Sequence, residues 1–192
     1  MRSIFQTVMK MPTPLHGFCA VAAFAGLQIV KGRLDASYAA SKHPVDYMTG
    51  QTGFSAQTVK EYYAHMQAEG TLEIYVTTQL IDYAFIAAIF CMGLFVCTFI
   101  ARAGREGSWG RRIGILAGVA LMAGAVSDAI ENAWSFVMLA DPAGFANWLA
   151  IAYSSFAVVK FALITCAMLL VIVSLLLSLI GRLSRKARLG KS

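Results

Sequence analysis

Five polar residues lie inside segments that are otherwise apolar, and their side chains could bind a ligand or transfer protons. A charge at the centre of a bilayer costs about 2.5–3.5 kcal/mol by insertion measurements, so such residues usually face other helices or a wet cavity. Carboxyl groups held there could contact the polar end of a ligand, or act as proton donor and base. We call these five residues the polar cluster: Asp82, Asp128, Glu131, Asn132 and Lys160.

Helical spacing predicts that these residues meet. Asp128, Glu131 and Asn132 fall at i, i+3 and i+4 and share one helix face. Three carboxyls against one lysine leave excess negative charge, so either a carboxyl is protonated or a cationic or hydroxylated group completes the site. Two further residues, Gln79 on the stripe that leads to Asp82 and Tyr153 on the face of Lys160, extend the candidate set. The candidate ligand-binding residues are therefore Gln79, Asp82, Asp128, Glu131, Asn132, Tyr153 and Lys160.

A structural interpretation of the same residues is equally open. Lys160 could simply neutralise Asp128 or Glu131, while Asn132 hydrogen-bonds a neighbouring helix. Such contacts would fix the register and orientation of the helices without binding anything.

Metal and redox chemistry have no support in the cysteine and histidine pattern. The cysteines lie in apolar runs without a C-x-x-C pair, and no two histidines share a helix face. We therefore expect no metal site and no cofactor, and interpret the cysteines as packing residues: Cys19, Cys91, Cys97 and Cys166.

The composition indicates that the helices carrying the polar cluster lie in a lipid bilayer. The chain has 192 residues, of which 58% are hydrophobic and 14% charged, whereas soluble domains average roughly 45–50% and about 25%. A spanning helix needs about 20 mostly apolar residues, and four segments qualify: 14–30, 74–101, 113–139 and 147–180. Ala23-Phe24-Ala25 in the first segment also resembles a signal-peptidase site. The fold class predicted is all-α, a bundle of four transmembrane helices in a single domain.

Basic residues predict the orientation. Arginines crowd the connector between the second and third spans and the tail 181–192, while lysines and arginines are spread thinly over the loop 31–73. By the positive-inside rule both termini face the cytoplasm of a bacterium, and the loop 31–73 is external. Counted from the arginines at about 1.5 Å per residue, the polar cluster reaches the outer third of the membrane. A polar cup open to the outside is therefore expected there.

An extra amphipathic helix is expected in the long external loop. Ser55 is typical of an N-cap and Gly70 of a helix stop. Between them one apolar stripe recurs at helical spacing: Val59, Tyr62, Tyr63 and Met66.

Small residues in the third span predict close helix packing in the cytoplasmic half of that span, away from the polar cluster. Gly114-x-x-x-Gly118 allows backbones to approach, either within the chain or in a homodimer.

Two resemblances follow from these motifs. Gln79-Leu80-Ile81-Asp82 and Ser127-Asp128-Ala129-Ile130-Glu131-Asn132 resemble motifs of a widespread group of uncharacterised bacterial four-span integral membrane proteins. The second motif is similar to the group's L-D-x-x-E-N signature, with Ser127 in place of the leucine. Topology and acid placement more weakly resemble the emopamil-binding-protein superfamily, which implies an intramembrane cavity for sterols or apolar amines.

Three functions therefore remain open. The first is binding of a lipid-like or amphiphilic small molecule in the cup. The second is an accessory or scaffold role in a larger membrane complex, with a purely structural cluster. The third is a lipid- or sterol-modifying enzyme of isomerase type, although we favour a function other than catalysis. Expected partners are membrane lipids and other membrane proteins or a second copy, and no nucleic acid.

Overall fold

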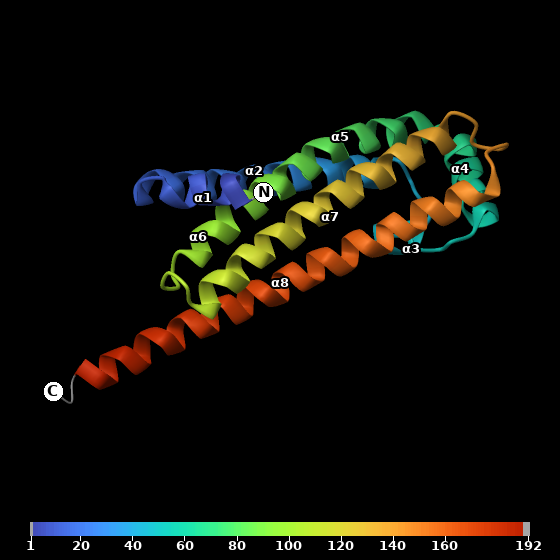
Figure 1. The fold of residues 1–192 in the computed structure, drawn as a ribbon. Helices are drawn as coiled ribbons and strands as arrows, with labels where there is room; N and C mark the ends of the chain where they lie inside the picture. The colour runs from blue at the N-terminus through green and yellow to red at the C-terminus, as the bar shows by residue number, and fades with distance from the viewer. Residues whose placement is uncertain (1, 190–192) are drawn as a thin grey trace. The chain divides into compact units, whose positions relative to one another are not determined.

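The computed structural model describes residues 2–189, with side chains described for residues 4–184, and the regular structure of these residues is entirely helical. Residues 190–192 of the predicted basic tail lie outside the described part. In chain order (Figure 1) the elements are α1 (Arg2–Lys10), α2 (Thr13–Ala40), α3 (Tyr47–Gln51), α4 (Ala56–Ala68), α5 (Leu72–Cys91), the π-helical segment η1 (Met92–Val96), α6 (Cys97–Ala101), α7 (Trp109–Leu139) and α8 (Asn147–Leu189).

Membrane-spanning helices are confirmed. Among residues 2–189, four helical stretches are long and apolar enough to cross a bilayer: Thr13–Ala40, Leu72–Ala101, Trp109–Leu139 and Asn147–Ser184. Large apolar side chains on them are exposed, for example Phe18 at 71% and Val21 at 69%. These surfaces suit hydrocarbon, because lipid tails are as apolar as the side chains that they contact. The protein is therefore an all-α membrane protein.

The first spanning helix is longer than the apolar run predicts. It continues past Val30 to Ala40, into the segment expected to be loop. Lys31 and Asp35 form an ion pair one helical turn apart, and Leu34 is buried. A polar helix face carrying an i, i+4 pair extends a helix beyond its hydrophobic part.

Two compact units make up the chain. The first consists of residues 1–26, 89–123 and 163–192, and the second of residues 27–88 and 124–162. Each of the long helices contributes a segment to both units. All seven candidate ligand-binding residues belong to the second unit.

The extra helix predicted in the first loop is α4, and it belongs to the second unit. Its start is fixed by the Ser55 side chain, which accepts a hydrogen bond from the Thr58 N–H at 3.2 Å. After its end Gly70 adopts a φ of +69°, which suits glycine. The apolar stripe of α4 packs on the ends of the spans. The resulting core contains Val59, Tyr63, Met66, Tyr75, Met138, Phe145, Leu149 and Tyr153.

In the first unit, α7 and η1 approach at backbone distance. A Cβ atom added to Gly118 would lie 2.6 Å from the Gly93 carbonyl oxygen, so only glycine allows this contact. Gly114 is similarly close to Ala101 of α6 and Ser174 of α8. Both glycines of the G-x-x-x-G motif thus face other helices of the same chain. The close helix packing predicted around this motif is therefore present within the chain.

Candidate functional site

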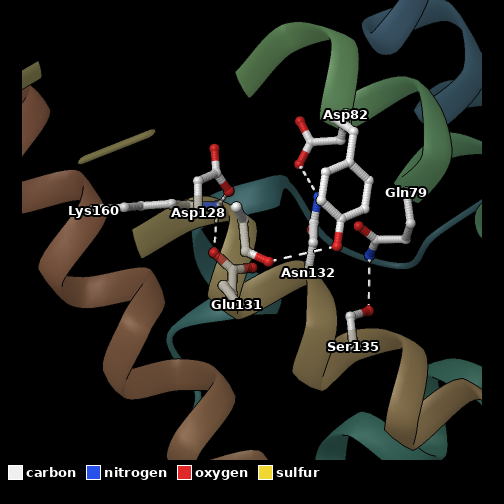
Figure 2. Close-up of polar contacts among 9 residues, drawn as sticks. Gln79, Asp82, Asp128, Glu131, Asn132, Ser135 and Lys160 are labelled. Carbon is white, nitrogen blue, oxygen red and sulfur yellow. Dashed lines mark hydrogen bonds and ion pairs between the residues drawn. The ribbon is translucent and has the colours of Figure 1, made fainter. Parts of the chain in front are cut away.

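Lys160 of α8 lies between two carboxylates of α7. Its Nζ atom donates to Asp128 Oδ1 at 2.7 Å and forms an ion pair with Glu131 Oε2. These three residues are 5%, 4% and 0% exposed, respectively. The predicted i, i+3 spacing on α7 therefore places both acids on the face that meets α8, and Figure 2 shows the lysine reaching toward them.

Asp82 of α5 joins the same group through Asn132 of α7. Its Oδ2 atom accepts a hydrogen bond from Asn132 Nδ2 at 2.7 Å, and both side chains are buried (Figure 2). Asp82 also lies near enough to Asp128 and Lys160 to interact with them electrostatically. The structure thus brings together all five members of the polar cluster from three spanning helices.

Gln79 lies one turn from Asp82 but has a different partner. Its Nε2 atom donates to Ser135 Oγ at 3.0 Å, and both residues are buried. Ser135 also interacts with the Tyr63 hydroxyl of α4, whose pKa is raised by burial. Gln79 therefore links the polar stripe of α5 to α4 and does not contact the carboxylates by a hydrogen bond. Ser135 was not predicted, although it follows Glu131 at i+4 on the same face.

Tyr153 lies in the core beneath α4. It is 3% exposed and packs with Tyr63 and Tyr75. No hydrogen bond joins its side chain to a member of the cluster within the described residues, so Tyr153 belongs to the aromatic core beside the cluster.

Two acceptor atoms of the cluster are buried with neither a hydrogen bond nor an ion pair among the described residues. They are Glu131 Oε1 and Asn132 Oδ1, both on residues with no exposed surface. Buried polar atoms nearly always have a partner, and an unsatisfied one costs about 1–3 kcal/mol. The cluster therefore contains more acceptors than donors, in addition to three carboxyls against one ammonium. A group that donates hydrogen bonds, charged or neutral, would complement it.

Comparisons with protein-family models, with curated proteins and with solved structures found no match.

A second polar cluster lies in the first unit and was not predicted from the sequence. His16 of α2 is fully buried, and its Nε2 atom lies 3.1 Å from the Phe95 carbonyl oxygen and 3.0 Å from Thr98 Oγ1. Its Nδ1 atom lies 3.2 Å from Arg102 Nη1. Because an arginine only donates, Nδ1 accepts and Nε2 carries the hydrogen. Phe95 lies in the π-helical segment η1, and its carbonyl oxygen also accepts a hydrogen bond from Thr98 Oγ1 at 3.2 Å.

Proposed function

We propose that this integral membrane protein binds a lipid-like or amphiphilic small molecule through the polar cluster. The polar end of the ligand is a hydrogen-bond donor, such as a protonated amine or a hydroxyl group. Asp82, Asp128 and Glu131 accept from it, while Lys160 and Asn132 orient these acids. The apolar body of the ligand lies among the surrounding helices, in a cup that opens to the outer side of the membrane.

The unsatisfied acceptors carry this proposal. Glu131 Oε1 and Asn132 Oδ1 are buried and have no partner in the described part of the chain. Lys160 contacts Asp128 and Glu131, whereas Asp82 has its hydrogen bond from the neutral amide of Asn132. A cationic amine brings several N–H donors and positive charge together, and thus offsets both deficits.

Binding of a long-chain amine tests the proposal. Dodecylamine is titrated into the detergent-solubilised protein and its retention measured by native mass spectrometry, with dodecanoate as the probe of equal length and opposite charge. We expect retention of dodecylamine alone, weakened at least about tenfold in Glu131→Gln, since charged hydrogen bonds contribute about 1.5–3 kcal/mol. Glu61→Gln, on the exposed face of α4, is the matched control.

Equal retention of both probes, or equal loss in Glu61→Gln, would reject a donor-specific site. Thermal unfolding of Glu131→Gln and Asp128→Asn separates binding from a structural role. Near-normal stability with lost binding supports the ligand site. Collapse of both variants in detergent supports a purely structural cluster instead.

The accessory and enzymatic alternatives predict other observations. An accessory or scaffold subunit would be stable only with partner chains, which native mass spectrometry of gently extracted protein detects, together with a homodimer. An isomerase-type enzyme would convert a sterol or lipid, with one carboxyl as donor and another as base.

We further propose that the protein resides in the bacterial cytoplasmic membrane with both termini in the cytoplasm. The arginines of the connector and tail support this orientation by the positive-inside rule. Fusions of alkaline phosphatase after Pro44 and after the C-terminus test it. We expect activity only from the fusion after Pro44, because the enzyme folds outside the cytoplasm. The reverse result would invert the topology.

A further inference from the structure

A cavity of about 410 Å³ lies in the first unit, where the connector between α6 and α7 meets α8. Its lining combines glycines, arginines and serines with a single large apolar residue, and no acidic residue of the described chain lines it. The lining residues are Ala103, Gly104, Arg105, Ser108, Leu177, Ser178, Gly181 and Arg182.

Two guanidinium groups give this cavity its charge. Arg182 donates from Nε at 3.3 Å and from Nη2 at 2.9 Å to the Ala103 carbonyl oxygen, which holds its side chain against the connector. A guanidinium carries five N–H donors, so several of them remain for a ligand. Arg105 is exposed and forms no ion pair within the described part of the chain. The nearby carboxylate of Glu106 pairs with Arg111 instead.

A buried hydroxyl without a partner lies in the same wall. Ser178 is 8% exposed, and its Oγ atom has no hydrogen-bond partner among the described residues. Gly104 and Gly110 pack directly on it, since a Cβ atom added to either would lie 3.0 Å and 2.5 Å from Oγ, respectively. A hydroxyl in this position needs an acceptor. Two guanidiniums and a free hydroxyl together form a site for an oxyanion.

The surroundings indicate the source of that oxyanion. Leu177 lines the cavity, and on either side of it α8 exposes Leu176 at 54% and Ile180 at 57%. The apolar surface of α8 therefore runs directly into the charged cavity. Trp109, at the start of α7, is 70% exposed, as is typical of residues at the level of lipid headgroups.

We propose that this cavity binds the phosphate group of an anionic phospholipid. Arg105 and Arg182 bind the phosphate oxygens and Ser178 donates a hydrogen bond to one of them. The acyl chains lie along the exposed leucines of α8. This site is separate from the polar cluster, so the proposal stands or falls independently of the function proposed above.

Native mass spectrometry of the full-length, detergent-solubilised protein tests the proposal. Phosphatidylglycerol is titrated in, with phosphatidylcholine of the same acyl chains as the zwitterionic probe and inorganic phosphate as a soluble competitor. We expect selective retention of phosphatidylglycerol that inorganic phosphate does not displace. Displacement by inorganic phosphate would support the oxyanion site but assign it to free phosphate. Equal retention of phosphatidylcholine would overturn it.

Charge-removing variants distinguish the cavity from general attraction. Arg105→Gln combined with Arg182→Gln should weaken phosphatidylglycerol binding at least about tenfold, because charged hydrogen bonds are lost. Arg112→Gln is the control for one charge, since Arg112 lies near the same connector, outside the cavity, with its guanidinium over the Trp109 ring. A loss as large in Arg112→Gln would overturn the proposal.

A cavity-filling variant keeps the test independent of charge. A Cβ atom added to Gly181 meets nothing within 4 Å, so the backbone there accepts a side chain, and Gly181→Leu adds apolar bulk to the lining of the cavity. We expect it to weaken phosphatidylglycerol binding while thermal unfolding stays near that of the wild type. Unchanged binding in both Gly181→Leu and the double arginine variant would overturn the assignment.

Discussion

At the scale of single residues, the stability of the folded protein with a buried polar cluster depends on Lys160. It is the one ammonium that contacts both Asp128 and Glu131 in the described chain. All three groups are buried, so neither solvent nor a second cation compensates the acids. Stability and the proposed ligand binding should therefore depend on the same side chain.

Replacement of Lys160 by methionine should unfold the protein at markedly lower temperature. The apolar stem keeps its packing, but two carboxylates remain without their cation. Removing one partner of a buried ion pair costs about 3–5 kcal/mol. Thermal unfolding in detergent measures the loss, and Lys160→Met combined with Asp128→Asn should recover part of it. A double variant no more stable than Lys160→Met would contradict this account.

His43 gives a second prediction at the residue scale, outside the spans. Burial lowers the pKa of its imidazole below the ordinary value of 6.5, and His65 lowers it further, while the Val45 backbone and Asp46 oppose the shift. The unfolded chain then binds the proton more tightly than the folded protein. The free energy of unfolding should therefore be fully retained above pH 6.5 and decrease as the pH falls below it.

The variant His43→Phe tests this dependence. The ring of His43 stacks with Tyr38 and contacts Tyr62 and Tyr75, and phenylalanine can keep those contacts. We expect a flatter stability profile between about pH 7 and 5 than in the wild type. Unfolding temperatures measured across that range provide the comparison, and parallel profiles would assign the dependence to other groups.

At the scale of elements, contact between α7 and η1 depends on glycine. The Gly118 backbone lies against the Gly93 carbonyl, where no side chain fits. The π-helical turn of η1 also presents the Phe95 carbonyl to His16 of α2. Close packing and an irregular helix thus occur at one place in the first unit.

Gly118→Ala should lower the free energy of unfolding, because its methyl group would lie 2.6 Å from a backbone oxygen. Overpacking of this kind costs about 1–3 kcal/mol. Gly26→Ala in α2 is the matched control, since nothing lies within 4 Å of an added Cβ atom. There the higher helix propensity of alanine should raise stability by about 0.5–1 kcal/mol. Thermal unfolding of both variants in the same detergent checks the contrast.

At the scale of the whole molecule, the exposed apolar faces make the bilayer part of the fold. Val21 of α2 and Met168 of α8 are 69% and 63% exposed, although both lie in spanning helices. The apolar window of α2 is the least hydrophobic of those among the described residues, and that of α8 is the most hydrophobic. The two helices should therefore differ in their tolerance of a charge.

Val21→Asp should reduce membrane integration far more than Met168→Asp. A central aspartate costs about 2.5–3.5 kcal/mol on the insertion scale, and the window of α2 has less apolar surface to offset it. The fraction of protein that resists alkaline carbonate extraction measures integration. Equal losses would mean that burial against other helices, rather than hydropathy, decides insertion of α2.

Local sequence patterns were enough to predict the elements. Runs of about 20 apolar residues identify spans because each helix must satisfy its backbone hydrogen bonds alone in lipid. The predicted N-cap at Ser55, the stop at Gly70 and the apolar stripe of α4 were also confirmed. Capping and amphipathicity could be predicted because they depend on neighbours along the chain. The i, i+3 spacing of Asp128 and Glu131 likewise fixed their common face. The sequence alone thus determined an all-α membrane protein with acids buried in its spans.

Only the tertiary structure decided how those side chains are paired. That Lys160 contacts both Asp128 and Glu131, while Asn132 binds Asp82, depends on the rotation of each helix about its axis. The partners of His16 and the cavity beside Ser178 were unforeseen for the same reason. Residues distant along the chain meet there through packing, and hydropathy contains no information about which faces meet.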